Sequence, residues 1–544
     1  MAGLLARALA MLVACLVAGL LAGAATAAAG ATLAPAPATT YYVRADGGLA
    51  SQCDGRVDAA YRGAASGGHC AWKNPLVALP PGAPARIAGG DTLVIAAGSY
   101  MMGFGAPGAD RCSLDWPWDC VLSPLPSGPD AAHPTRIVGA GFDAGCPAAP
   151  QLWGTERASS VISLVGTRHA QVSCLEITDH AGCAEFHTGE LKCQRDAYPY
   201  GAWAQSGIVA TDSSDVLLSQ LNIHGLANTG IHAGRLSDWR LSKVRIAANG
   251  WAGWNGDVGE RTSSNSGRIQ FSEVDIEWNG CPETLADRRP AGCWTAYGDG
   301  LGTADTGGQW LIEDSRFRYN TQDGLDLLYH NEQGSVTLRR VWAEGNAGNQ
   351  IKVAGTAVIE NSVIVGNCGF FHGKAFTRDV ADCRAAGDAV ALVGKAAGQL
   401  LTFVNNTVIS EGNTVLLFSG VKGTQLIAQN NVLIGRPNAL APGRQSADIY
   451  LDEKTPDDAL TDRYNLKVGL RNAACRPAGT LCLAAGQQVL VNETPGQVDP
   501  RPGPRSPARA SGLPTGGAVP ADDLYRRPRP RGAASTRGAA DAAP

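Results

Sequence analysis

Three aspartates and one lysine recur at matching positions in three consecutive glycine-rich segments of the chain: Asp299, Asp323, Asp326 and Lys352. The segments align on the apolar residues Leu301, Leu325 and Ile351. Two residues before these lie Asp299, Asp323 and Asn349, and one residue after them lie Gly302, Asp326 and Lys352. Because neighbouring residues of a strand point to opposite faces, both sets can point outward from a sheet whose strands are about 5 Å apart. We therefore expect three carboxylates and one ammonium group in one small patch.

Carboxylates this close repel one another, which raises their pKa unless a cation or a proton neutralises them. Calcium prefers such a cluster of oxygen ligands, so we predict that Asp299, Asp323 and Asp326 bind Ca²⁺. Beside a divalent ion the ammonium form of Lys352 is disfavoured, which would let Lys352 act as a neutral base. A uronate held by the ion would lose the proton α to its carboxylate and expel the glycosidic oxygen. The predicted reaction is β-elimination, with Lys352 as its catalytic residue.

The same residues also have a structural interpretation. Asp-Gly pairs are common at turns for backbone reasons alone. Asp326, one coil below Lys352, could form an ordinary ion pair between coils, which would contribute little stability.

Four further polar residues are weaker candidates. Lys374 and Arg378 could bind a substrate carboxylate, but they lie between Cys368 and Cys383 in what looks like a solvated, disulfide-closed loop. We expect His180 and His187 to be structural or surface residues rather than catalytic ones.

The elements that must position these side chains are short apolar strands that recur along most of the chain. Inward apolar and outward polar residues alternate over a few positions, and each strand ends at an asparagine or Asn-Gly turn. The apolar residues Ile208, Ile231 and Trp254 recur every 23 residues or so. Such a unit cannot bury its apolar face alone, so neighbouring units must stack. The pattern predicts an all-β fold, a single-stranded right-handed parallel β-helix with disulfide-stapled loops.

The turn asparagines of this repeat predict a ladder in which each side-chain amide bonds to the next one. Asparagine also suits the left-handed backbone of such turns. The residues concerned are Asn249, Asn279, Asn320, Asn346 and Asn367.

The two ends of the chain differ from this repeat. Residues 1–27, with Arg7, an apolar run and Ala25-Thr26-Ala27, indicate a secretory signal peptide. A lipoprotein signal acylated at Cys15 is the alternative. We assign 40–160 to an N-terminal cap and first coils, 161–494 to the β-helix, and 495–544 to a Pro/Ala/Arg-rich tail, which we expect to be loose.

Fourteen cysteines follow the signal, and an even number in an exported chain favours disulfides. Their spacing suggests the pairs 53/70, 112/120, 183/193, 281/293, 368/383 and 475/482, which leaves 146 with 174. Zinc is disfavoured because no Cys-x-x-Cys pair or nearby histidine group has ligand spacing.

A net charge of −4 with 17% charged residues provides no overall field for nucleic acid or an anionic membrane. Apart from the signal, no run approaches the roughly 20 apolar residues of a membrane span. We expect a monomer that is secreted or periplasmic, with an acidic polysaccharide as its partner.

The segments around Asp299, Asp323 and Lys352 resemble the calcium-dependent pectate lyases of polysaccharide lyase family nine. That family carries an Asp-Gly coil, then Asn-x-Asp-Asp-Gly-x-Asp, then Gly-Asn-x-x-Lys. The resemblance covers about 60 residues and implies that Asp299, Asp323 and Asp326 bind calcium and that Lys352 is the base. Gln322 replaces the first Asp of the family's Asp pair, which predicts weaker calcium binding.

Three functions follow as hypotheses. The leading one is a secreted Ca²⁺-dependent polysaccharide lyase that cleaves a uronate-containing glycan. The alternative is a non-catalytic carbohydrate-binding or cell-surface β-helix protein, which the presence of Gln322 favours. A β-helix glycoside hydrolase that uses Asp323 and Asp326 is the third, although three residues of separation in a turn does not ensure the geometry that such enzymes need.

Overall fold

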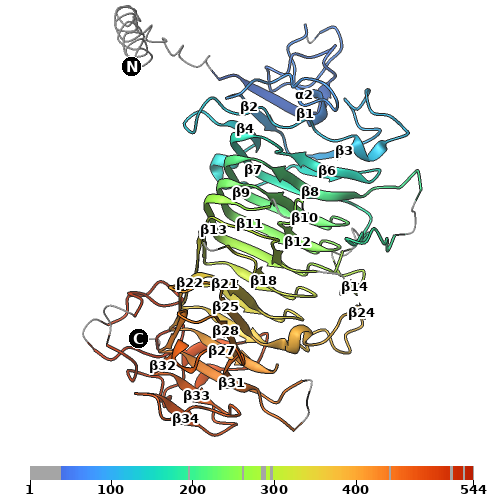
Figure 1. Cartoon of the computed structure of the whole chain (residues 1–544). Helices are drawn as coiled ribbons and strands as arrows, with labels where there is room; N and C mark the ends of the chain where they lie inside the picture. Colours follow the sequence, from blue (N-terminus) through green and yellow to red (C-terminus); the bar gives the residue numbers. More distant parts are fainter. Residues whose placement is uncertain are drawn as a thin grey trace, which may run out of the picture. The chain divides into compact units, whose positions relative to one another are not determined.

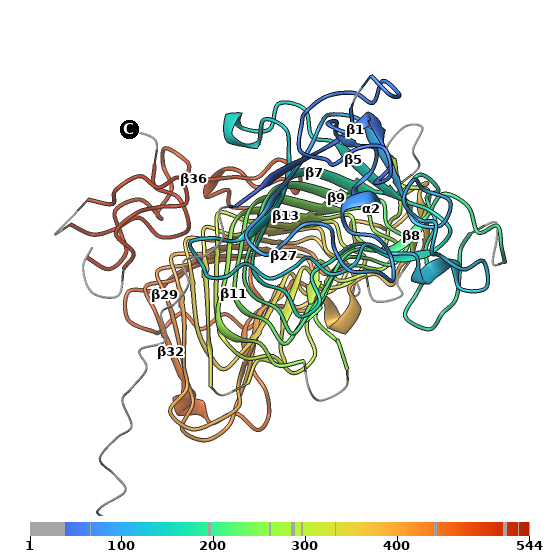
Figure 2. The same cartoon turned by 90° about the horizontal axis from the view of Figure 1, so that it is seen from above.

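Short apolar strands stack in this protein into parallel ladders, so that each strand buries its inner side chains against the next coil. The structure is a computed structural model, and it describes residues 38–544 except for these positions: 66, 194–196, 260–262, 284–288, 295–297, 332, 440, 442, 515–518, 531–532 and 543–544. The expected signal peptide (1–27) and Cys15 lie outside the described residues. Figure 1 shows the coils stacked in chain order, and Figure 2 shows them superimposed along the stack.

The coils build three ladders of parallel strands, which confirms the predicted parallel β-helix. The first ladder contains β1 (Thr40–Gly48), β2 (Thr92–Ile95), β4 (Thr135–Gly139), β7 (Arg168–Thr178), β9 (Ser214–His224), β11 (Ser237–Ala247), β13 (Ser266–Glu277), β16 (Gln309–Glu313), β19 (Ser335–Arg339), β22 (Thr356–Glu360), β26 (Leu400–Val404), β29 (Gln425–Gln429) and β32 (Leu460–Arg463). The strands β1, β2 and β4 of the expected N-terminal region therefore belong to the same ladder as the later strands.

The second ladder joins the ends of the long strands β7 to β13 to shorter strands on either side. Its shorter strands are β3 (Ser99–Met102), β5 (Gln151–Gly154), β17 (Arg316–Arg318), β20 (Trp342–Glu344), β23 (Val363–Gly366), β27 (Thr407–Ser410), β30 (Val432–Gly435), β33 (Leu466–Val468) and β34 (Leu481–Leu483).

The third ladder is a separate ten-stranded sheet, and it carries the predicted site. Its strands are β6 (Ala158–Ser163), β8 (Ala204–Thr211), β10 (Thr229–Gly234), β12 (Ala252–Asn255), β15 (Leu301–Gly302), β18 (Leu325–Leu327), β21 (Ile351–Ala354), β25 (Val390–Gly394), β28 (Thr414–Gly420) and β31 (Ala447–Leu451).

The remaining elements lie in loops and at the ends. They are the short helix α2 (Pro75–Ala78), the 3₁₀ turns η1 (Pro117–Asp119), η2 (Phe142–Ala144), η3 (Arg384–Gly387) and η4 (Asp457–Ala459), and the pairs β14 (Cys293–Trp294) with β24 (Thr377–Asp379) and β35 (Leu490–Asn492) with β36 (Asp499–Pro502). Among the described residues, no helix has the length and apolar character to cross a membrane.

Large aromatic side chains fill the inside of the coils that precede the predicted site. Trp254 packs against Trp239, Phe271 and Trp310, with ring centroids 5.5 to 6.4 Å apart. All four side chains are buried. Packing of this density fixes the height and rotation of each coil, so the outward side chains of the same strands are held in place.

The predicted asparagine ladder is present, although its last member is different. The Nδ2 of Asn249, Asn279 and Asn320 each donates to the Oδ1 of the next ladder asparagine, at 2.8 to 2.9 Å. Asn346 then donates to Oε1 of Gln350 at 2.8 Å. Asn367 was predicted as a member, but Gln350 takes that place because it follows Asn346 within the same coil.

The ladder asparagines are not the left-handed residues of these turns. The residue before each of three ladder asparagines has a positive φ instead: 54° at Ala248, 60° at Trp278 and 56° at Tyr319. The buried amide ladder therefore accompanies turns that are strained just before it.

Seven disulfides close loops of the β-helix, and they join the pairs that the spacing suggested. They are Cys53–Cys70, Cys112–Cys120, Cys146–Cys174, Cys183–Cys193, Cys281–Cys293, Cys368–Cys383 and Cys475–Cys482. The loop closed by Cys183–Cys193 contributes His187 to the site below, and Arg384 of the site directly follows Cys383.

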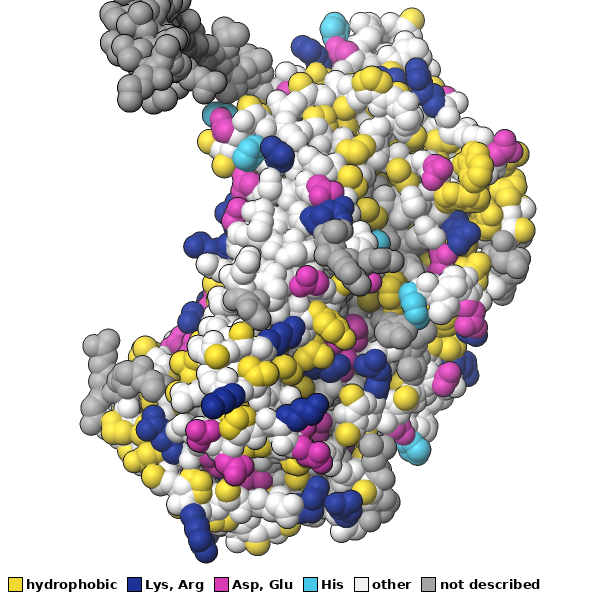
Figure 3. Space-filling model, in the orientation of Figure 1, with side chains coloured by type: hydrophobic (Ala, Val, Ile, Leu, Met, Phe, Trp, Pro, Cys, Tyr) yellow, Lys and Arg dark blue, Asp and Glu magenta, His cyan; other side chains and the backbone are white. Residues whose placement is uncertain are grey.

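The C-terminal segment was expected to be loose, and its described part is instead packed on the β-helix. Ala508 and Ala539 belong to an apolar cluster with Val363, Val365 and Val432 of β23 and β30. Composition misled the prediction because small alanines fit closely against a sheet and arginines can donate to exposed turn carbonyls. Figure 3 shows acidic and basic side chains interspersed over the visible face, in keeping with the small net charge.

Candidate functional site

The predicted site lies on β15, β18 and β21, three consecutive strands of the ten-stranded sheet. The register is the predicted one, since Leu301 pairs with Leu325 and Leu325 with Ile351. These three side chains are fully buried. The next position outward places Asp326 beside Lys352. The inner apolar residues therefore determine that Asp326 and Lys352 share the outer face, one coil apart.

Lys352 lies between two carboxylates and is largely buried. Its Nζ is 2.6 Å from Oδ2 of Asp323 and 3.3 Å from Oδ2 of Asp326. The Asp323 side chain is only 1% exposed, and its Oδ1 accepts a hydrogen bond from the backbone N–H of Asn349 at 2.7 Å. Asp299 accepts from the backbone N–H of Asp323 at 2.9 Å. The four predicted residues are thus brought together as one hydrogen-bonded group.

A second cation, which we did not predict, joins the group. The guanidinium Nη1 of Arg384 lies 3.0 Å from the same Asp323 oxygen that Lys352 contacts. Arg384 is the first residue of η3 and follows Cys383, whose disulfide to Cys368 closes the loop. Its position after a cysteine in a loop gave no signal in the sequence.

The charges of the group are not balanced. Burial, together with the Asp323 and Asp326 carboxylates, raises the pKa of Asp299 well above its ordinary value. Burial alone would lower the pKa of Lys352, but Asp323 and Asp326 outweigh this effect and raise it. The two carboxylates therefore favour the ammonium form of Lys352, and the neutral base that we expected requires additional positive charge nearby.

The donor set fits calcium only in part. Asp299 and Asp326 line a cavity, and the burial and neighbouring carboxylates that raise the pKa of Asp299 are effects that a bound cation would oppose. Asp323 is turned instead onto Lys352 and Arg384. Accordingly, the described residues contain no group of three or more His, Cys, Asp or Glu side chains arranged around one metal position. Asp299 and Asp326 are the residues that would hold calcium.

The cavity beside this group, which we call the acidic cavity, has a volume of about 770 Å³. It is lined by the Asp/Lys/Arg group and by Thr303 to Asp305, Leu328 and Tyr329. Trp251 and His187 form another part of the lining.

Two rings of this lining are stacked. The ring centroids of His187 and Trp251 are 5.5 Å apart at an interplanar angle of 28°. Trp251 Nε1 is buried and has no hydrogen-bond partner among the described residues. Aromatic faces of this kind offer apolar area to the C–H face of a sugar ring.

The other predicted candidates have different positions. Lys374 stacks over Phe370 at 5.4 Å, and Arg378 lies on β24, which pairs with β14. His180 stacks on Trp153 at 4.3 Å, as a structural residue would. His187, for which the sequence indicated only a structural or surface position, belongs to the acidic cavity.

The chain contains a second lysine between two aspartates, which serves as an internal comparison. Lys467 Nζ lies 2.6 Å from Asp448 and 2.5 Å from Asp462, and its side chain is 0% exposed. A trio of this kind can therefore be purely structural. What distinguishes Lys352 is that it lines a cavity large enough for a sugar.

Comparison with known proteins agrees with the fold. Residues 202–408 match the family described as right handed beta helix region. No curated protein matches the sequence.

Among solved structures, the chain is similar to an alginate lyase from Paenibacillus sp. strain FPU-7, with 17% identity and a TM-score of 0.35 over 70% of this chain and 94% of that one. It is also similar to pectate lyase Pel9A, with 14% identity and a TM-score of 0.41 over 93% and 96%. The catalytic domain of a GH87 α-1,3-glucanase has 10% identity and a TM-score of 0.31 over 73% and 62%. Similarities of this size carry no argument about substrate or mechanism.

Proposed function

We propose that this protein is an extracytoplasmic polysaccharide lyase that cleaves a uronate-containing glycan by β-elimination, with Ca²⁺ as cofactor. The observation that carries the proposal is the position of Lys352. It lines a sugar-sized cavity, it is held between Asp323 and Asp326, and Arg384 lies on the same Asp323 oxygen.

In the proposed reaction, Arg384, which lines the cavity and is 34% exposed, attracts the uronate carboxylate, which fixes the sugar beside Lys352. Lys352 Nζ, as the neutral amine after losing a proton to water, then takes the proton α to that carboxylate and becomes an ammonium group. The C–H electron pair forms the new carbon–carbon double bond, the bond to the glycosidic oxygen breaks, and that oxygen takes a proton from water. Calcium bound by Asp299 and Asp326 would supply the positive charge that offsets these carboxylates and acidifies the α-proton.

A second candidate is supported by the charge of Lys352 itself. Because Asp323 and Asp326 raise its pKa, Lys352 as an ammonium ion would bind a sugar carboxylate without removing a proton. The protein would then be a non-catalytic glycan-binding β-helix protein.

The experiment that separates these candidates follows unsaturated product by ultraviolet absorbance on pectate, alginate and a glycosaminoglycan, with calcium and with chelator. We expect calcium-dependent product from the wild type and a rate lowered about 10³-fold in Lys352→Ala, because general-base removal costs about 10²- to 10⁴-fold. Lys374→Ala, an exposed-loop control, should retain full activity.

The remaining outcomes are informative as well. Binding of a glycan without product supports the binding protein, and new reducing ends without unsaturation support a hydrolase. Wild-type activity that Lys352→Ala retains, with unchanged melting temperature, would refute the assigned base.

A further inference from the structure

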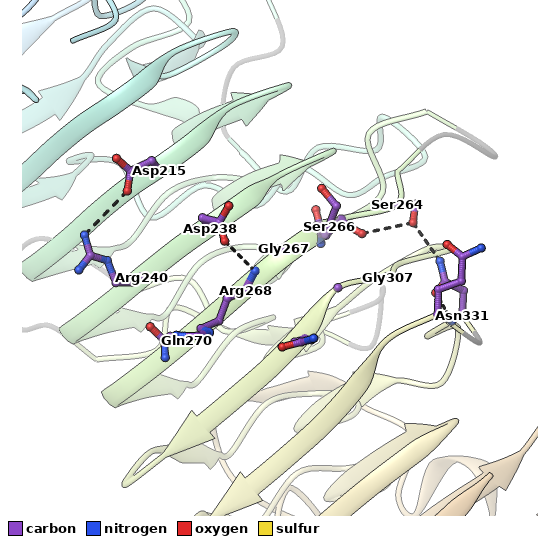
Figure 4. A pocket seen from close by; sticks show the side chains of 14 residues that line it. Asp215, Asp238, Arg240, Ser264, Ser266, Gly267, Arg268, Gln270, Gly307 and Asn331 are labelled. Carbon is purple, nitrogen blue, oxygen red and sulfur yellow. Dashed lines mark hydrogen bonds and ion pairs between the residues drawn. The ribbon is translucent and has the colours of Figure 1, made fainter. Parts of the chain in front are cut away.

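A second hollow is lined in part by two segments of the chain that also line the acidic cavity. We call it the polar groove. It has a volume of about 740 Å³, and its lining includes Asp215, Asp238, Arg240, Ser266, Arg268 and Gln270. Figure 4 shows these side chains on successive strands, with Ser264 and Asn331 at the far end. The strands are β9, β11 and β13, which pair in parallel and are therefore about 4.8 Å apart.

The two hollows share one wall. Residues Thr303 to Asp305 and Leu328 to Tyr329 face the acidic cavity. Two residues further along the same two segments, Gly307 and Asn331 face the polar groove. Two residues span at most about 7 Å of chain, so the rims of the two hollows are within the length of a short oligosaccharide.

The segments between the two hollows are held together by hydrogen bonds between buried residues. Their inner residues Thr306 and His330 are buried and form a parallel bridge. His330 Nε2 lies 3.0 Å from the carbonyl oxygen of Gly308, and Asn265 Nδ2 donates to Thr306 Oγ1 at 2.9 Å. Tyr329, by contrast, is 57% exposed at the crest. Its ring also faces Lys395 Nζ at 5.8 Å, so the crest presents an aromatic face beside a cation.

The charged residues of the polar groove are two aspartates, Asp215 and Asp238, and two arginines, Arg240 and Arg268. Asp238 already accepts from the backbone N–H of Arg268 at 3.0 Å and from Ser237 Oγ at 2.8 Å. Asp215 lies 2.9 Å from the His169 ring. The guanidinium of Arg240 is 3.9 Å from Asp215, beyond hydrogen-bond distance, and its side chain is 56% exposed. The acids thus have partners in the protein, while an exposed arginine keeps its donors for a ligand.

We propose that a single acidic polysaccharide chain occupies both hollows. It would lie in the acidic cavity over Lys352, cross the wall at Tyr329, and continue along the polar groove. There Arg240 and Arg268 would bind its carboxylates, and Ser266 and Gln270 would bind its hydroxyls. This inference rests on the proposed function for the class of glycan, and it makes the protein selective for long chains.

The test is affinity electrophoresis in gels that contain pectate, alginate, a glycosaminoglycan or, as a neutral control, dextran. All variants carry Lys352→Ala, so that cleavage does not remove the ligand. The double variant Arg240→Ala/Arg268→Ala should bind the retarding acidic glycan about tenfold more weakly. Arg316→Ala is the matched control, because Arg316 is 54% exposed and 3.7 Å from an aspartate, Asp275, but lies on β17 of the second ladder, outside the groove; its retardation should be unchanged.

Each outcome bears on one of the two proposals. If the double variant is retarded as strongly as its parent, the groove does not bind the glycan, and the proposed function is unaffected. Absence of retardation of the parent in every acidic glycan would also overturn the groove, and the proposed function is decided separately by the unsaturated-product assay. If the enzyme is active, the double variant in the wild-type background should raise KM for the polymer about tenfold and leave kcat and the cleavage of short oligosaccharides unchanged. Equal effects on long and short substrates would contradict a distal site.

Discussion

At the scale of single residues, Arg384 is the second cation on the buried carboxylate of Asp323. Asp323 is almost fully buried, and a buried carboxylate that lost one of its two cations would be poorly compensated. Arg384 is 34% exposed, so it can stabilise Asp323 on one side and receive a substrate carboxylate on the other.

We therefore predict that Arg384→Ala lowers kcat/KM, or glycan affinity if the protein only binds, by about 10- to 100-fold, since hydrogen bonds to charged groups contribute about 1.5 to 3 kcal/mol. Arg378→Ala is the matched control from the same disulfide loop. It should behave as wild type in the same kinetic and binding assays. A comparable loss in both variants would indicate that the loop acts through its fold rather than through the Arg384 side chain.

At the scale of elements, the turns next to the site depend on the asparagine ladder. Asn320 Oδ1 accepts from the backbone N–H and the Nδ2 of Asn279, and Asn320 Nδ2 donates to Asn346. Asn320→Ala would leave several buried polar atoms without partners, so we expect about 3 kcal/mol or more of destabilisation. The measurement is denaturant or thermal unfolding. Asn367→Ala, outside the ladder, should cost much less, and equal costs would show that the ladder is not stabilising.

Sequence periodicity predicted the pairing of the three strands that carry the site, but not the loop residues that contact them, and the reason is physical. The pairing of Leu301, Leu325 and Ile351 could be predicted because each coil must bury its inner residue against the next one. The partners of Asp323 could not, because Arg384 arrives from a loop whose path is set by a disulfide and not by the repeat. Gln350 at the end of the ladder depends in the same way on a local turn.

At the scale of the whole molecule, the C-terminal segment acts as a clasp along turns of the later coils. Arg529 has a 0% exposed side chain, and it donates to Asn361 Oδ1 at 2.9 Å and to Asp541 Oδ1 at 2.8 Å. Asn405 Nδ2 donates to the carbonyl oxygen of Thr536 at 3.1 Å. The clasp thus provides hydrogen-bond partners for the side chains of the turn residues Asn361 and Asn405.

If this clasp stabilises the fold, its buried arginine must matter more than its exposed ones. Arg529→Ala should lower the free energy of unfolding by about 3 to 5 kcal/mol, because Asp541 and Asn361 lose their buried hydrogen-bond partner. Arg526→Ala removes an ion pair to Asp314 of similar length, 2.7 Å, from a side chain that is 59% exposed, and it should cost little. Thermal unfolding of both variants measures the difference. Equal small effects would mean that the segment only rests on the coils, whereas a large loss in Arg529→Ala alone would make residues 495–544 part of the folded unit on which the site depends.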